Sequence, residues 1–306
     1  MATSGTGVLP TADELPEVLL DLGVPHEDIG ELVALRASLL KDPAALRSLE
    51  EGLPALVDGI GTLDRPFQLP EPPREPEALG RFFNLFVYLA ALPYVLDYHQ
   101  RHGIPRDISR RTLADLGRSV AAHRRWRGTG GLRYPRWLRF HFRGELYQLG
   151  RLQFQRARLG TRTGEGLAAA GLPYVPGDPC LTVHIPDFYG PLSPQACDHS
   201  MALARAFFPR HFPGERYRIA LLHSWVLDRQ LARYLPPGSN LIRFQDRFHT
   251  AYESAEPADT DPIAFVFGSA DHPLDTLPRR TTLQRALTDH LRAGGHWYIG
   301  HGWCPL

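Results

Sequence analysis

The stretch that decides the fold is CLTVHIPDFYGPLSPQACDHSMALARAFF at residues 180–208, followed by RIALLHSWVLDRQLARYLPPGSNLIRFQDRFH at residues 218–249. Cys180–Ile185 and Arg218–His223 are short runs rich in apolar and β-branched residues, and each predicts a strand. Between them, Ser193 followed by a proline has the pattern of a helix N-cap and first helical residue. A strand–helix–strand unit of this length predicts two parallel strands joined by a right-handed crossover.

The chain on the N-terminal side of this unit carries helical patterns up to residue 127. The predicted helices lie at residues 12–22, 26–40, 43–60, 78–101 and 106–125. The pattern changes at the glycine-rich run Gly128–Gly131. We therefore expect an all-helical N-terminal domain at residues 1–127 and an α+β domain with a mixed sheet at residues 128–306.

The α+β half begins with a predicted antiparallel hairpin, because Trp137–Phe142 alternates polar and apolar residues and Leu146–Ala157 continues the pattern after a turn. Further strands are predicted at residues 240–249, 261–268 and 296–303, with helices at residues 228–235 and 282–293 and a loop at residues 160–178. Where two neighbouring strands of such a sheet diverge, they open a crevice. Ligands commonly bind there, beside helix N-termini.

Composition excludes several classes of partner. The formal net charge of +1 gives no reason to expect nucleic acid. The N-terminus lacks a basic segment followed by an apolar run, so no signal peptide is expected, and the most apolar window, Phe82–Leu96, is too short for a bilayer span. Three distant cysteines without CxxC spacing fit a reducing cytoplasm. We expect a cytoplasmic protein without a membrane partner.

Two histidines are candidate catalytic groups. His184 lies inside one strand of the central unit and His223 ends the other, so the two imidazoles face one crevice if the strands are neighbours. A neutral histidine is a suitable general base for an amine or hydroxyl near neutral pH. The alternative is a pair of hydrogen-bonded core histidines. The fourteen histidines show no HxxxH or HExxH spacing, so no metal site is expected, although a metal-dependent hydrolase stays a third hypothesis.

Two further features carry a chemical and a structural interpretation each. Tyr234, at the end of a predicted short helix, could protonate a departing thiolate, or it could only pack its ring. The helix that begins after Ser193 could bind an anion through its free N–H groups. Pro191 and Pro194 remove two of those donors, so an ordinary strand-to-helix turn is the alternative.

Three segments resemble a known family. They are WLRFHFRGELYQLGRLQFQ at residues 137–155, VHIPDFYGPLSPQACDHSMALARAFF at residues 183–208 and HSWVLDRQLARYLPPGSNLIRFQDRF at residues 223–248. They are similar to bacterial acyltransferase-domain proteins in which a helical N-terminal domain precedes a GNAT-like C-terminal domain. The similarity covers most of the chain.

This resemblance implies an N-acyltransferase that moves an acyl group from a pantetheine thioester, acyl-CoA or an acyl carrier protein, to a small-molecule amine. By the family pattern, the pantetheine would bind along the first strand and the pyrophosphate at the loop before the helix. The implied residues are Leu181, Thr182, Val183 and Ile185 for the pantetheine, and Tyr189, Gly190, Leu192 and Ser193 for the pyrophosphate. Tyr234 corresponds to the tyrosine that protonates the thiolate.

The phosphate loop departs from the family pattern. Its sequence is DFYGPLS at residues 187–193, in place of the usual Q/R-x-x-G-x-G/A. A carrier-protein donor and a non-catalytic binding module that retains the fold are therefore the alternatives to an enzyme that uses free acyl-CoA.

Overall fold

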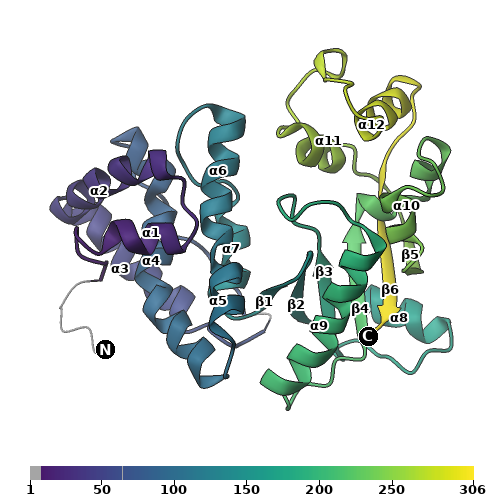
Figure 1. Cartoon of the computed structure of the whole chain (residues 1–306), viewed down its shortest axis with the longest axis horizontal. Coiled ribbons are helices and arrows are strands. Elements are labelled where there is room, and N and C mark those ends of the chain that lie inside the picture. The colour runs from purple at the N-terminus through teal and green to yellow at the C-terminus, as the bar shows by residue number, and fades with distance from the viewer. Residues whose placement is uncertain (1–7, 64) are drawn as a thin grey trace. The chain divides into compact units, whose positions relative to one another are not determined.

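The chain forms two compact units that divide between Gln148 and Leu149 (Figure 1). The computed structural model describes residues 8–63 and 65–306. The helices of the first unit are α1 (Leu15–Asp21), α2 (His26–Lys41), α3 (Pro43–Val57), α4 (Glu77–Arg101), α5 (Arg106–Leu113), α6 (Asp115–Arg127) and α7 (Pro135–Phe142). The helical N-terminal half is thus as predicted, whereas the domain boundary at residue 127 stays a prediction.

Helix α4 is the centre of the first unit. Most of its apolar side chains, among them the fully buried Phe82, Phe83 and Phe86, lie in one core with those of α1, α2 and α3. By length and composition α4 could cross a membrane, but 67% of its most apolar window is buried inside the protein. That burial is typical of the core helix of a globular unit. The length argument from Phe82–Leu96 was wrong, because α4 extends beyond this window to 25 residues.

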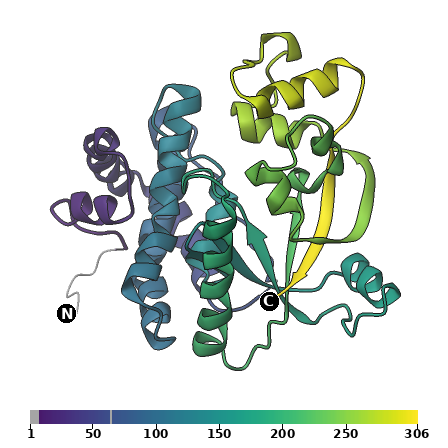
Figure 2. The same cartoon turned by 45° about the vertical axis from the view of Figure 1, so that its right-hand side comes forward.

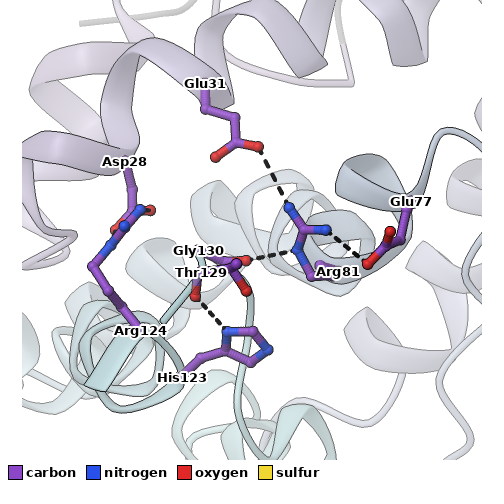
Figure 3. Close-up of polar contacts among 8 residues, drawn as sticks. All are labelled: Asp28, Glu31, Glu77, Arg81, His123, Arg124, Thr129 and Gly130. Atoms are coloured by element: carbon purple, nitrogen blue, oxygen red, sulfur yellow. Dashed lines mark hydrogen bonds and ion pairs between the residues drawn. The ribbon is translucent and has the colours of Figure 1, made fainter. Parts of the chain in front are cut away.

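A polar cluster holds the loop after α6 against this core (Figure 3). Arg81 donates from Nε to the Gly130 carbonyl oxygen over 2.8 Å, and His123 Nδ1 lies 2.8 Å from the Thr129 carbonyl oxygen. Asp28 is completely buried, and both of its carboxylate oxygens accept hydrogen bonds from the Arg124 guanidinium. A buried carboxylate is tolerated only when it is paired and hydrogen-bonded in this way.

The second unit holds the sheet. Its elements in chain order are β1 (Leu146–Leu149), which the division between the units crosses, β2 (Leu152–Arg158), α8 (Thr161–Ala169), β3 (Pro179–His184), α9 (Pro194–His211), β4 (Ile219–Ser224), η1 (Trp225–Leu227), η2 (Arg229–Arg233), α10 (Asn240–Gln245), β5 (His249–Pro257), α11 (Thr260–Phe267), η3 (Leu274–Thr276), α12 (Thr282–Arg292) and β6 (Tyr298–Pro305). The strand order is β1-β2-β3-β4-β6-β5. Strands β3 and β4 are parallel, and β2–β3, β4–β6 and β5–β6 are antiparallel, which confirms the mixed sheet.

Helices cover this sheet. Helix α9 lies in front of the strands in Figure 2, and its Ser200 hydroxyl accepts from the backbone N–H of Arg151 over 2.7 Å, at the start of β2. A Cβ at Gly150 would lie only 2.7 Å from the same hydroxyl, so a glycine is needed at this turn. Helix α8 contributes Leu167 to a small core with Leu221 of β4.

The predicted hairpin was wrong in its first strand. Pro135–Phe142 is helix α7, and the hairpin is β1–β2, with Gly150 in its turn. Leu138, His141 and Phe142 are the buried residues of α7, at helical spacing. A window of six residues satisfies both the helical and the strand pattern, and Pro135 at the first helical position favours the helix.

Three other sequence-based assignments also need correction. The strand predicted at residues 240–249 is helix α10, whose N-cap Ser239 accepts from the Ile242 N–H, and the strand begins only at His249. The strand predicted at residues 261–268 is helix α11. The loop predicted at residues 160–178 contains α8. The pattern of a short apolar run does not distinguish a strand from one or two turns of helix.

The buried Asp28 yields a stability prediction. Arg124→Ala leaves the carboxylate buried without its guanidinium, and removing one partner of such a pair costs about 3–5 kcal/mol. Urea unfolding of the full chain should therefore show a loss of this size. The matched control is Arg127→Ala, an exposed arginine in the last turn of the same helix, which should change stability by less than about 0.5 kcal/mol. Equal stability of the two variants would contradict the structural role of the pair.

Candidate active site

Strands β3 and β4 share only a short stretch of sheet. Their register consists of Leu181 opposite Ala220 and Thr182 opposite Leu221. On their other edges both strands are paired over six positions, β3 with β2 and β4 with β6. Within the described sheet, the two strands therefore part after Thr182, at their carboxyl ends. A crevice between parallel strands at this end is where α/β proteins commonly bind ligands.

The two candidate histidines lie on either side of this parting. Side chains alternate along a strand, and residues opposite one another across neighbouring strands face the same side of the sheet. Because Thr182 is opposite Leu221, His184 and His223, two residues further on each strand, face the same side. The structure thus brings the two imidazoles to corresponding positions beyond the last paired residues.

The two histidines have different hydrogen-bond partners. His184 is half-buried, and its Nε2 lies 2.9 Å from the side-chain oxygen of Gln155 on β2. His223 is exposed, and its Nδ1 lies 2.7 Å from Nδ1 of His301 on β6. In the part of the chain that the structure describes, Nε2 of His223 has no hydrogen-bond partner. His223 is therefore the histidine with a ring nitrogen available to a substrate.

Loss of water around both rings of the pair favours their neutral forms. This desolvation lowers the pKa of His223, although part of its side chain reaches solvent. Burial lowers the pKa of His301 to about 4, helped by the nearby His223 and Arg162. A neutral imidazole has one lone pair and one N–H, so a bonded neutral pair is suited to general acid–base work near neutral pH.

A buried arginine is hydrogen-bonded to the backbone of the predicted phosphate loop. Arg151 is 8% exposed, and it donates from Nε to the Gly190 carbonyl oxygen and from Nη1 to the Pro186 carbonyl oxygen, each over 2.7 Å. Ser193 caps α9 by accepting from the Ala196 N–H over 3.2 Å, as predicted from the sequence. The positive charge of Arg151 beside the loop suits an anion, but no sequence signal pointed to this residue.

The remaining predicted binding residues follow β3 into this loop. Leu181 and Thr182 lie in the paired part of β3, and Val183 lies beyond it. The other predicted positions, all outside strand and helix between β3 and α9, are Ile185, Tyr189, Gly190, Leu192 and Ser193. The predicted set is thus contiguous along the parting strand and the loop.

Tyr234 belongs to a different cluster. Its hydroxyl lies 2.9 Å from Nδ1 of His290 on α12, and its ring is 6.2 Å from that of Trp297. These contacts do not join it to His184 or His223. Its role as an acid toward a thiolate stays a prediction.

A cavity of about 440 Å³ adjoins the histidine pair. It lies between β5, β6 and the turn after β4, and its polar lining includes Asp228, Arg229, Arg233, Tyr252, Glu253, Tyr298 and His301. Tyr252 stacks on His301 with ring centroids 4.0 Å apart and planes within 15°. His301 thus forms part of the cavity wall and also contacts His223, which is not among the lining residues.

Sequence reasoning missed His301, although it lies in the strand predicted at residues 296–303. The only available signal was a second histidine in an alternating strand, and its pairing with His223 depends on β6 lying beside β4. Among residues 8–63 and 65–306, no group of three or more His, Cys, Asp or Glu side chains is arranged to hold a metal ion. The metal-dependent hydrolase hypothesis therefore gains no support from this site.

The comparisons with known proteins agree with this geometry. Residues 13–144 match the model of the N-acyltransferase N-terminal domain, and residues 146–304 match that of the GNAT-like C-terminal domain. An acyltransferase solved in complex with decanoyl-CoA and teicoplanin is 37% identical, with a TM-score of 0.89 over 100% of this chain and 91% of its own. A mutant acyltransferase with octanoyl-CoA, and an acyltransferase with CoA and 10C-teicoplanin, give the same values. None of the curated proteins compared with the chain matches it.

The two hydrogen bonds from Arg151 to the loop, called the clasp below, can be tested by amide hydrogen exchange. Arg151→Met removes two charge-assisted hydrogen bonds, each worth about 1.5–3 kcal/mol, so exchange in residues 187–190 should quicken by about tenfold or more. Arg205→Met, which removes an exposed arginine from α9, is the control and should leave exchange in the loop unchanged. Unchanged loop exchange in the Arg151 variant would contradict the clasp.

The histidine pair makes a prediction about pH. Because the pKa of His223 is lowered by the fold, its ring should titrate in the native protein below the ordinary histidine value of about 6.5. The unfolded chain then binds more protons just below pH 6.5, so the contribution of this residue to stability falls as the pH falls through that range. NMR of the ring protons measures the titration directly. A native pKa of 6.5 or higher would contradict the prediction.

Proposed function

The chain belongs to the acyltransferases that join an N-acyltransferase N-terminal domain to a GNAT-like C-terminal domain, and from this premise we propose that its substrates are an octanoyl- to decanoyl-length acyl-CoA and a teicoplanin-like amine. The transfer of an acyl group from a pantetheine thioester to an amine is the activity of its family, and its structural neighbours are acyltransferases solved with acyl-CoA or CoA. The choice of acyl length and acceptor is the proposal. A non-catalytic role is not favoured.

The parting of β3 from β4 is the observation that carries the proposed donor site. A pantetheine arm is a linear chain with two amide groups, and a strand that has lost its neighbour offers N–H and C=O groups along one edge. On this proposal the arm lies along Val183–Ile185. The thioester then lies near His223, whose Nε2 has no partner among the described residues.

The phosphates of the donor would lie at the loop between β3 and α9. The capped N-terminus of α9 supplies oriented N–H groups and a partial positive charge, and the loop backbone is held by Arg151. The charge of Arg151 adds to the partial positive charge of the helix. The neighbours solved with acyl-CoA or CoA support free acyl-CoA as the donor over an acyl carrier protein.

Chemically, the reaction needs positioning and a proton acceptor. The amine nitrogen attacks the thioester carbonyl carbon, the carbon–sulfur bond breaks, and the nitrogen loses a proton. The neutral His223–His301 pair is the proposed acceptor of that proton, because desolvation lowers the pKa of both rings. His184 is the second candidate, but its Nε2 is already hydrogen-bonded to Gln155.

The cavity beside His301 is the proposed place for the acceptor amine. The Glu253 carboxylate and the aromatic ring of Tyr252 line it, and these groups suit an amine that is carried on a hydroxyl-rich or aromatic body. The similarity to proteins crystallised with teicoplanin supports an acceptor of that class. On this proposal the partners are small molecules, in the cytoplasm, without nucleic acid or membrane.

Acyl transfer in vitro tests the proposal. The purified protein is incubated with decanoyl-CoA, with decanoyl-loaded carrier protein, or with acetyl-CoA, and with deacylated teicoplanin as acceptor. Mass spectrometry should show an N-decanoyl product with decanoyl-CoA, and His223→Phe should lower kcat by about a hundredfold or more while leaving the Kd for decanoyl-CoA within about twofold. The absence of product and of binding for every donor would contradict the proposed function.

A further inference from the structure

The two imidazoles of the His223–His301 pair face different places. In the sheet order β3-β4-β6-β5, His223 on β4 borders the parting from β3, whereas His301 on β6 borders β5 and the cavity. Their Nδ1 atoms are 2.7 Å apart. Neither Nε2 atom has a hydrogen-bond partner among the residues that the structure describes. One Nε2 is therefore available on the thioester side and one on the cavity side.

A contact between two Nδ1 atoms fixes how protons are shared. One of them must carry the proton and the other must accept it. In a neutral pair, the histidine that donates through Nδ1 has a lone pair at Nε2, and the histidine that accepts has an N–H at Nε2. The pair thus always presents one base and one acid at its two ends, and proton transfer across the Nδ1 contact exchanges them.

We propose that His223 and His301 form a two-imidazole proton relay, in which His301 takes the proton from an amine bound in the cavity and His223 delivers one to the departing sulfur. This relay rests on the proposed function. It assigns His301 as a second catalytic residue, and the cavity as the acceptor site, without a need for a separate acid such as Tyr234.

The step balances in atoms and electrons. The amine nitrogen forms a bond to the thioester carbon, and the carbon–sulfur bond breaks with its electron pair on sulfur. The nitrogen proton goes to Nε2 of His301, the Nδ1 proton of His301 goes to Nδ1 of His223, and the Nε2 proton of His223 goes to the thiolate. The products are an amide and a thiol. Both rings end neutral with their tautomers exchanged, and exchange with water at the two Nε2 atoms restores the starting state.

The surroundings of His301 fix its ring for this purpose. Tyr252 stacks on it, so rotation of the imidazole would break this stacking contact, and the Arg162 guanidinium lies 4.3 Å from the centroid of the Tyr252 ring. The charged and titratable groups around the ring are His223, Arg162 and Tyr252, and the cavity adds Asp228, Arg229, Arg233 and Glu253. The positive charge of Arg162 disfavours protonation of His301 to the imidazolium. A proton taken up by the pair is therefore passed on more readily than it is kept.

A double-mutant comparison tests the relay. His301→Phe keeps an aromatic ring for Tyr252 to stack on, so the fold and the Kd for decanoyl-CoA should be preserved while kcat falls by about a hundredfold or more. Because the two histidines act as one unit, their losses should not multiply. The kcat of the double variant His223→Phe/His301→Phe should lie within about threefold of the kcat of the slower single variant. His272→Phe, an exposed histidine outside the site, is the control and should stay within about twofold of the wild type.

Chemical rescue separates a proton-transfer role from a structural one. His301→Ala opens space beside the cavity. Added imidazole should raise the kcat of this variant at least tenfold, and the increase should follow the fraction of imidazole that is neutral. Three outcomes would overturn the relay: a kcat for His301→Phe within twofold of the wild type, losses that multiply in the double variant, or a folded His301→Ala variant that imidazole does not rescue. A wild-type protein that forms no amide would instead remove the proposed function, so the two failures are distinguishable.

Discussion

The whole site depends on two parallel strands that are each held more firmly on their outer edges than to one another. Strand β3 is paired with β2 at six positions and β4 with β6 at six, but β3 and β4 share only two. The outer pairings fix the direction of each strand, so the parting between them is part of the sheet itself. An opening that exists without a ligand places backbone donors and acceptors in advance, which lowers the ordering cost of binding.

The same sheet brings the chemical groups to the opening. Strand β4 carries His223 to its edge, and the antiparallel neighbour β6 places His301 directly opposite. Helix α9 begins after the loop that leaves β3, and Arg151, in the turn before β2, holds that loop. The proposed donor site, the proposed proton transfer and the proposed acceptor cavity therefore all depend on the order of four neighbouring strands.

Much of this arrangement could be predicted from the sequence, because its signals are local. The strand at Cys180–Ile185, the Ser193 cap and the strand at Arg218–His223 each rest on a few adjacent residues, and a crossover of this length implies parallel strands. Sequence reasoning failed where a short apolar run satisfies two periods, as in α7, α10 and α11. It could not find His301 or Arg151, because their roles depend on partners about 80 and 40 residues away along the chain.

Amide hydrogen exchange with and without a non-hydrolysable decanoyl-CoA thioether tests the central claim most directly, because it reports where along the backbone the donor lies. A pantetheine arm in the parting should slow exchange at Val183, Ile185 and Leu222, while the β2 amides of residues 153–158, already paired with β3, stay unchanged. Protection that appears only elsewhere, with residues 183–185 exchanging at the same rate as in the free protein, would contradict this account of the site.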